Sequence, residues 1–128
     1  EAFDSTTEIE GDPLMLRIAV RNGLVNACDF SPEGEAVTLV MRRASDGSVR
    51  LRIGDRGPGI PEYAAGRVFD RFYSLKNEVT GRKGSGIGLT FVRSTMRLHG
   101  GEATLENREG GGAELCMIFA AGAGRPAR

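Results

Sequence analysis

The glycines of this chain constrain its fold more than any other feature, because they are gathered into clusters. The chain has 19 glycines in 128 residues, and they concentrate at residues 54–59, 81–88 and 110–112. Glycine and proline punctuate turns, so GDRGPGIP at residues 54–61 is by itself compatible with a surface loop. This loop directly follows the strand-like run VRLRI, however, and a loop with few side chains lets its backbone approach a flat or charged ligand. The clusters therefore raise the question of a ligand as well as of turns.

Length and composition are those of one ordinary globular domain. The 128 residues can bury a sizeable core, and 40% of them are hydrophobic and 27% charged. The net charge of zero gives no general attraction to nucleic acid or to an anionic membrane. No apolar run reaches membrane-spanning length, and no signal peptide opens the chain. We expect Cys28 and Cys116, which lie in apolar segments, to be reduced core thiols.

The hydrophobic patterns predict two main helices and several strands. Asp12 and Pro13 predict the start of a mostly buried helix over residues 14–29. Four of its apolar residues fall near one another on the helical wheel, namely Leu14, Ile18, Val25 and Cys28. A second helix is predicted over residues 86–99, and one or two short helices over residues 62–73 with Phe69 and Phe72 inward. Strands are predicted at residues 6–10, 37–43, 49–53, 103–107 and 114–119.

This order of elements favours an α+β fold. We expect a two-layer sandwich in which the helices pack on one face of a mainly antiparallel mixed sheet. Residues 1–120 are expected to form the domain, and the tail at residues 121–128 is expected to be disordered.

Polar residues on the first helix and after the second strand are the first candidates for a site. Asn22 and Asn26 are four residues apart and lie one above the other. A single such Asn is most simply a structural hydrogen-bonding residue, but two of them with Asp29 make a polar strip. Amide oxygens suit Mg²⁺, which commonly bridges phosphates. Asp55 could accept a hydrogen bond from a base amino group or cap its own loop, and the residues alone leave both readings open.

A second candidate site is the glycine run Gly84-x-Gly86-x-Gly88, which opens the second helix. Walker A and Rossmann spacings are absent, but a helix start with free N–H groups can bind an anion. Residues 74–85 before it are polar and aperiodic, which is typical of a functional lid. Arg71, Arg82 and Lys83 are either solvated charges or phosphate contacts.

Taken together, these motifs closely resemble the N, first glycine, F and second glycine boxes of sensor histidine kinases. In order they are Asn22…Asn26, Asp55-x-Gly57-x-Gly59, Phe69-x-x-Phe72 and Gly84-x-Gly86-x-Gly88. The resemblance covers about residues 5–120 and implies the Bergerat fold of the GHKL superfamily, shared with gyrase and MutL. The stretches RFYSL and GRKGSGIGLTFV look more specifically like CreC-type sensor kinases.

The resemblance implies a site for ATP and Mg²⁺. Asn26 would coordinate the metal, with Asn22 beside it as a catalytic residue, and Asp55 would hold the adenine amino group. Residues 73–87 would form the ATP lid, and the expected basic catalytic residues are Arg71, Arg82 and Lys83. The other expected ATP-binding residues are Phe30, Gly57, Gly59, Ile60, Phe69, Phe72, Gly84, Ser85, Gly86, Ile87, Gly88 and Leu89.

Some positions depart from the family pattern. Asp29 and Phe30 stand where many members carry a basic residue and then Tyr, so Phe30 can still stack on adenine but Asp29 cannot neutralise phosphate. Ser74 replaces a common Arg of the F box, which shifts the expected phosphate contact to the three basic residues named above. Ala113 stands where a Thr often follows the late glycines.

Asn22 also bears on the reaction that the resemblance implies. ATP-hydrolysing relatives such as gyrase carry a Glu four residues before the metal Asn, and an amide cannot replace that general base. The implied function is therefore the ATP-binding catalytic domain of a two-component sensor histidine kinase, a protein kinase that donates the γ-phosphoryl group to a His on a separate dimerisation domain. A regulatory nucleotide-binding module without phosphotransfer and a GHKL-type ATPase remain the alternatives.

The expected partners are the His-containing dimerisation domain of the same kinase and a downstream response regulator. No contact with nucleic acid or membrane is expected for this part of the kinase. His99, the single histidine, ends a helix without the context of an acceptor site and is expected to be structural. We expect a cytoplasmic domain and leave open whether the complete kinase is anchored in the inner membrane.

Overall fold

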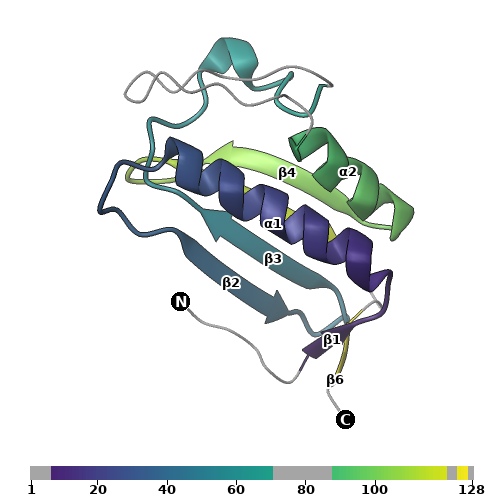
Figure 1. Cartoon of the computed structure of the whole chain (residues 1–128). Coiled ribbons are helices and arrows are strands. Elements are labelled where there is room, and N and C mark those ends of the chain that lie inside the picture. Colours follow the sequence, from purple (N-terminus) through teal and green to yellow (C-terminus); the bar gives the residue numbers. More distant parts are fainter. Residues whose placement is uncertain (1–6, 71–87, 121–123, 127–128) are drawn as a thin grey trace.

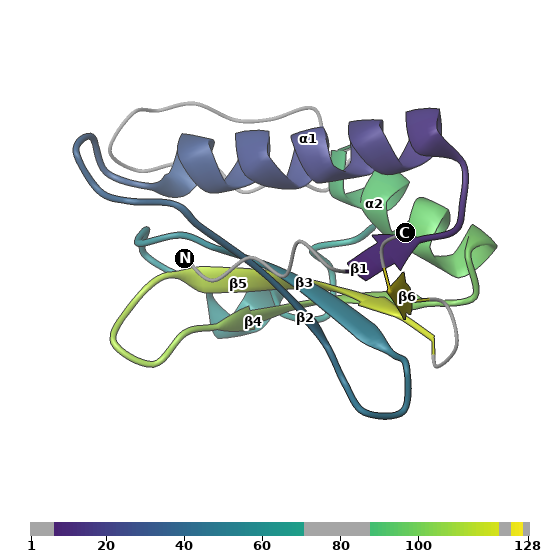
Figure 2. The same ribbon diagram turned by 90° about the horizontal axis from the view of Figure 1, so that it is seen from below.

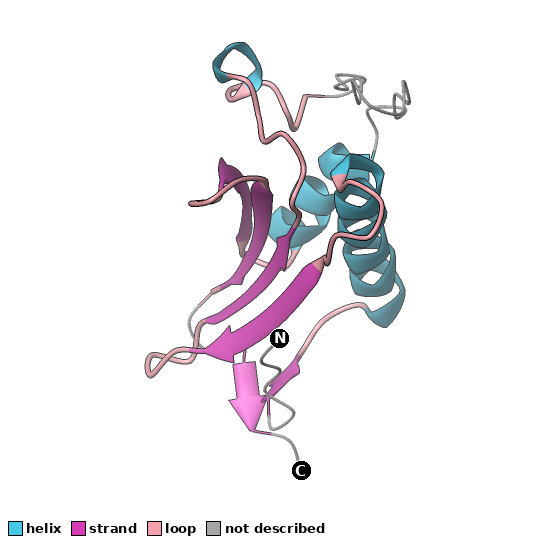
Figure 3. Cartoon of the chain, turned by 90° about the vertical axis from the view of Figure 1, so that its left-hand side faces the viewer, coloured by secondary structure: helices cyan, strands magenta, loops and turns pink. Residues whose placement is uncertain are grey.

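Two helices pack on one face of a four-stranded sheet in the computed structural model, which describes residues 7–70, 88–120 and 124–126 (Figure 1). The helices are α1 (Pro13–Phe30) and α2 (Gly88–Leu98), and the strands are β2 (Thr38–Arg43), β3 (Val49–Gly54), β4 (Glu102–Asn107) and β5 (Ala113–Phe119). The strand order is β2-β3-β5-β4, and each pairing is antiparallel. Figure 2 shows the helices and the sheet as two separate layers, and Figure 3 shows both helices (cyan) on the same side of the strands (magenta). The predicted two-layer α+β fold is confirmed.

A second, two-stranded sheet joins the two ends of the described chain. Its strands are β1 (Thr7–Ile9) and β6 (Gly124–Pro126), which pair antiparallel. The strand predicted at residues 6–10 is therefore present. Part of the tail that was expected to be disordered is instead a strand, because β1 offers unpaired backbone N–H and C=O groups that β6 can satisfy.

The start of α1 matches the prediction from Asp12 and Pro13. The Asp12 Oδ1 accepts hydrogen bonds from the backbone N–H groups of Leu14 and Met15 at 2.9 and 3.1 Å. His99, just after α2, reaches the same cap, because its Nε2 accepts from the Asp12 N–H at 3.0 Å. Its other ring nitrogen, Nδ1, donates to the Thr95 carbonyl at 2.7 Å. His99 thus joins the end of α2 to the start of α1, in agreement with the structural role expected for it.

The face of α1 that packs on the sheet differs from the apolar face that the sequence predicts. Ala19, Gly23 and Ala27 are the buried residues of α1, whereas Leu14 and Val25 are 63% and 45% exposed. A Cβ atom at Gly23 would come within 2.8 Å of side-chain atoms of both Ile53 and Leu115. The helix therefore lies so close to the sheet that only small residues fit at these three positions, while Leu16, Val20 and Leu24 pack partly buried against the core.

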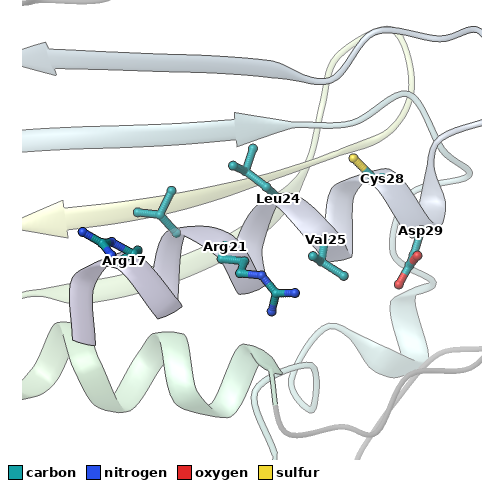
Figure 4. Close-up of a pocket in the computed structure, with 7 residues that line it drawn as sticks. Arg17, Arg21, Leu24, Val25, Cys28 and Asp29 are labelled. Atoms are coloured by element: carbon teal, nitrogen blue, oxygen red, sulfur yellow. The ribbon is translucent and has the colours of Figure 1, made fainter. Parts of the chain in front are cut away.

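An open groove runs along the outer side of α1 and is lined by Arg17, Val20, Arg21, Leu24, Val25, Cys28 and Asp29 (Figure 4). Cys28 is exposed there, so the expectation of a core thiol is wrong for this residue. Cys116 is buried on β5, and burial raises the pKa of its thiol. Both cysteines are free.

The segment after β3 contains less helix than predicted. Within its described part, only Glu62–Ala64 forms a 3₁₀ turn, and turns continue through Phe69. Phe69 packs against the hydrophobic core, as expected, while Phe72 lies outside the described residues. The second predicted helix is present as α2, in which Val92 and Met96 are fully buried in the core. None of the described helices combines the length and apolar character needed to cross a membrane.

Candidate nucleotide-binding site

Asp55 follows β3 directly and is buried, with 5% of its surface exposed. Its Oδ1 accepts hydrogen bonds from the backbone N–H of Gly57 at 2.9 Å and from that of Ala113 at 3.0 Å. Its own backbone N–H donates to the Ala113 carbonyl at 2.9 Å. Within the described part of the chain, no hydrogen bond reaches Oδ2. The two readings of Asp55 are therefore compatible, since Oδ1 caps the loop and Oδ2 remains an acceptor for a ligand.

The loop after Asp55 is held against the end of α1. A Cβ atom at Gly57 would overlap the carbonyl oxygen of Phe30, the last residue of α1. The Arg56 N–H donates to Ser31 Oγ at 3.2 Å, immediately after the helix. Gly57 therefore permits a backbone approach that no other residue could make without moving α1 or the loop.

The far end of the loop has its own backbone requirement. Gly59 has a φ of +82°, which a residue with a side chain rarely adopts. The next residue, Ile60, is half-buried and makes two hydrogen bonds to the Asn107 side chain. The expected base-binding residues Gly57, Gly59 and Ile60 therefore lie on one tightly supported loop.

Asn22 and Gly88 meet where α1 passes the start of α2. The Asn22 Nδ2 donates to the Gly88 carbonyl at 3.4 Å, and a Cβ atom at Gly88 would lie 3.8 Å from the Asn22 Cβ. Asn26 is half-buried one turn further along α1, and no hydrogen bond to its side chain is found among the described residues. Asn22 of the N box and the last glycine of the second glycine box are thus brought together, and Asn26 lies on the next turn of α1.

The two parts of the candidate site lie along one helix. Asn22 marks the contact with α2, and Phe30 marks the contact with the loop after Asp55. These residues are eight positions apart, which corresponds to about 12 Å along α1. Phe30 itself is half-buried beside the loop. The expected base end and the polar end therefore lie about two turns apart along the same helix.

Phe69, the first aromatic residue of the F box, is tied to α2. Its carbonyl accepts a hydrogen bond from Thr90 Oγ1 at 2.9 Å, and the Arg93 guanidinium lies 5.6 Å from the centre of its ring. Leu89, on the first turn of α2, packs on the core beside it. Phe69 and Leu89 therefore help to position the start of α2 by packing.

The remaining expected residues cannot be placed. Those outside the described residues are Arg71, Phe72, Ser74, Arg82, Lys83, Gly84, Ser85, Gly86 and Ile87. The expected lid at residues 73–87 falls there as well. None of the expected site residues lines the groove on the outer side of α1 shown in Figure 4.

The chemistry of the polar end fits one kind of metal ion. The described residues contain no group of three His, Cys, Asp or Glu side chains arranged to hold a metal. The candidate ligands on α1 are the amide oxygens of Asn22 and Asn26, and among the described residues neither oxygen accepts a hydrogen bond. Such a set is compatible with Mg²⁺, which takes its other ligands from water and from substrate phosphates.

The hairpin between β4 and β5 contributes residues to the site that the sequence analysis missed. Ala113 holds both the backbone and the carboxylate of Asp55. A Cβ atom at Gly112, whose φ is +87°, would overlap the Asp55 carbonyl oxygen. The glycine cluster at residues 110–112 was the available signal, but the chain gives no local indication that this turn touches a loop more than fifty residues away.

The fold and these contacts define a class of α+β domain with a buried carboxylate, Asp55, in a glycine-rich loop at one end of a helix and with two asparagines on that helix. The chain belongs to the family described as histidine kinase-, DNA gyrase B-, and HSP90-like ATPase, whose model matches residues 11–122. The expected Bergerat-type, GHKL assignment is thereby confirmed.

Similar proteins are sensor kinases. The chain is 44% identical over 104 residues to the sensor protein CreC of Escherichia coli, covering 81% of this chain and 22% of CreC. The structure of the mycobacterial sensor histidine kinase MprB matches with a TM-score of 0.81 and 31% identity, over 98% of this chain and 83% of that chain. The ATP-binding domain of PrrB from Mycobacterium tuberculosis matches with a TM-score of 0.66 and 35% identity, over 88% of this chain and 71% of that chain. The chain spans only about a fifth of the curated relatives' length.

Proposed function

We propose that this chain is the ATP-binding catalytic domain of a two-component sensor histidine kinase. In this proposal it holds Mg-ATP and presents the γ-phosphoryl group to a histidine on a separate dimerisation domain. The phosphoryl group then passes from that histidine to a response regulator. The observation that carries the proposal is the state of Asp55, whose Oδ1 is held by two backbone N–H groups while Oδ2 is left to accept. A buried carboxylate arranged in this way matches the exocyclic amino group of adenine.

The polar end of α1 is suited to the triphosphate. Asn22 contacts the start of α2, Asn26 lies one turn further along α1, and the first N–H groups of α2 together with its helix dipole favour an anion. Asn26, with Asn22 beside it, would hold Mg²⁺, which when bound neutralises part of the phosphate charge. The protein's own task is then to position the nucleotide, which is the main requirement for phosphoryl transfer.

The side chains of Asn22 and His99 favour transfer to an external acceptor over hydrolysis. Asn22 occupies the position next to Gly88 where a water-activating base would be useful, and a neutral amide cannot take a proton from water. His99 is engaged in structural hydrogen bonds with Asp12 and Thr95 at the opposite end of α2 from Gly88. Neither residue therefore offers a nucleophile or a base for reaction within the chain.

Incubation with γ-labelled ATP tests this proposal. The chain alone is expected to bind Mg-ATP without labelling itself, and addition of the helical dimerisation domain of its kinase should produce acid-labile phosphohistidine on that domain. Binding without transfer to the added domain would favour the regulatory module, and steady phosphate release without any acceptor would favour an ATPase. Label on His99 would contradict the assignment of an external acceptor.

A further inference from the structure

The β4–β5 hairpin lies against the loop after Asp55 at two separate points, and both contacts are made by side chains with no role in the proposed function. The hairpin turn comprises residues 108–112 and places three consecutive glycines at positive φ. This shape lets the backbone of Gly112 pass directly over the Asp55 carbonyl. The residues just before the glycines, Asn107 and Arg108, are thereby brought to the two ends of the loop.

Asn107 holds the far end of the loop. Its Oδ1 accepts a hydrogen bond from the Ile60 N–H at 2.6 Å, and its Nδ2 donates to the Ile60 carbonyl at 3.1 Å. One amide side chain thus satisfies both backbone groups of a residue 47 positions away, as a neighbouring strand would. The fit depends on the adjacent Gly59, because a Cβ atom there would lie 2.7 Å from the Asn107 Oδ1.

Arg108 holds the near end of the loop. Its Nη1 donates to the Asp55 carbonyl at 3.0 Å. The guanidinium occupies space that Gly54 leaves empty, since a Cβ atom at Gly54 would come within 2.7 Å of the same Nη1. Together with the Ala113 N–H on Oδ1, this contact fixes both the backbone and the side chain of Asp55.

We propose that Asn107 and Arg108 are positioning residues for adenine recognition. Arg108 fixes the Asp55 backbone and Asn107 fixes the end of the loop, so Oδ2 of Asp55 and the glycine backbone keep a constant spacing for the base. Neither side chain needs to touch the nucleotide. This inference rests on the proposed function, because it assigns the support of the base end of that same site.

The first test is the Asn107→Ala variant, which removes both hydrogen bonds to Ile60. Isothermal titration should show ATP affinity about fivefold lower with unchanged stoichiometry, the loss expected for one net hydrogen bond. The ATP-to-GTP affinity ratio should also fall, because the base is no longer held in register with Asp55. Amide hydrogen exchange at Ile60 should become faster, and exchange in the β-sheet core should not change. A merely structural role would lower the melting temperature without changing the affinity of the folded protein.

The second test uses conservative replacements. Asn107→Asp keeps an acceptor for the Ile60 N–H but places a carboxylate beside the Ile60 carbonyl, so it should lose affinity like Asn107→Ala. Arg108→Ala should weaken ATP binding by a similar factor, and Arg108→Lys, which can still donate to the Asp55 carbonyl, should restore most of it. Glu109→Ala is the matched control, because Glu109 is exposed on the same turn and makes no hydrogen bond or ion pair within the described part of the chain.

The outcomes separate this inference from the proposed function. If the unmodified chain fails to bind ATP, the proposed function is wrong. If the unmodified chain binds ATP while the Asn107 and Arg108 variants keep its affinity and its ATP-to-GTP ratio, only the positioning roles are overturned. Weaker ATP binding, a lower ratio and faster exchange at Ile60, with a normal Glu109→Ala variant, support them.

Discussion

The base end and the phosphate end of the candidate site are built in opposite ways. At the base end, Asp55 Oδ1 already has two hydrogen bonds, and its loop is tied to α1 and to the β4–β5 hairpin. At the phosphate end, Asn22 makes one long hydrogen bond of 3.4 Å to Gly88, and Asn26 makes none among the described residues. The first end is formed before a ligand arrives, whereas the second keeps polar atoms available.

The difference follows from what each end would bind. A purine is flat and rigid, and it contributes only a few hydrogen-bonding groups at fixed positions, so recognition depends on a matching fixed surface. Phosphates and Mg²⁺ carry strong charges and their own water ligands, so they can organise flexible amide and backbone groups around themselves. The comparison therefore predicts that the protein supplies the shape of the base end, and that the ligand would organise the phosphate end.

The largest effect is expected for Gly112→Ala, which tests whether the base end is truly preformed. The new Cβ atom would overlap the Asp55 carbonyl oxygen, and the residue would have to keep a φ of +87°. We expect the free energy of unfolding to fall by about 2 kcal/mol or more. ATP binding should fall by more than about tenfold, because the strain falls on Asp55 itself.

Gly66→Ala is the matched control for this variant. A Cβ atom at Gly66 would meet nothing within 4 Å, and Gly66 is not among the glycines with positive φ. Chemical denaturation and ATP titration of both variants provide the comparison, and Gly66→Ala should resemble the unmodified chain. Normal ATP affinity in folded Gly112→Ala would show that the base end adapts to its ligand.

The next largest effect is expected for Asp55→Asn. The two N–H groups of Gly57 and Ala113 should hold the new amide oxygen in place of Oδ1, which turns the amide NH₂ toward the base. This donor would face the adenine amino group, so ATP affinity should fall about tenfold. GTP should lose less, because guanine presents an acceptor at the corresponding position.

Competition between ATP and GTP measures this effect in one experiment. Asp46→Asn is a suitable control, because Asp46 makes a similar Asx-type contact with Ser48 in the distant β2–β3 turn. An unchanged ATP-to-GTP ratio in Asp55→Asn would remove Asp55 from base recognition.

A smaller effect is expected for Asn26→Ala at the phosphate end. Mg-ATP affinity should fall about fivefold, since Mg²⁺ would keep its ligands from water and phosphate. ADP affinity measured in EDTA should change little, because the base end is untouched. An equal loss in both titrations would show that Asn26 supports the fold instead of the metal.

The smallest effect concerns Glu102, which lies far from both ends of the site. Its pKa is lowered from the ordinary Glu value of 4.5 by a hydrogen bond from the Ala103 N–H and then by Arg97, whose Nε lies 3.3 Å from a carboxylate oxygen. A lowered pKa in the folded state means that the ionised group adds stability above pH 4.5, and that this contribution is lost as the pH falls through the folded-state pKa.

Glu102→Gln should therefore be slightly less stable than the unmodified chain at pH 7, by about 0.5 kcal/mol or less, because the group is largely exposed. The difference should shrink on acidification below about pH 4.5. Denaturation at several pH values provides the measurement, and ATP affinity at pH 7 should be unchanged. A stability difference that grows toward low pH would contradict the assigned direction of the pKa shift.

Several features of the fold and the site could be predicted from the chain alone. The structure contains the helix that starts after Asp12, the strand with the alternating pattern VRLRI, and the two strands β4 and β5 near the end of the chain. Each of these could be predicted because it depends on residues that are neighbours in the sequence. The order of the four boxes indicated the family. The buried face of α1 could not be predicted, because the apolar pattern that includes Leu14 and Val25 indicated a different face. The close approach of β3 and β5 instead buries the small residues Ala19, Gly23 and Ala27.

The sequence by itself determined the elements, the family and the polar residues available for a nucleotide, since each of these depends on local periodicity or on a short motif. Only the tertiary structure decided which oxygen of Asp55 is engaged within the described residues, because Oδ1 accepts a hydrogen bond from the backbone N–H of Ala113, 58 residues away. It also decided that Asn107 supports Ile60 and that Gly112 must lack a side chain. Such contacts join segments that are distant in the chain, and their distances are set by the packing of the whole sheet and α1, which no local pattern specifies.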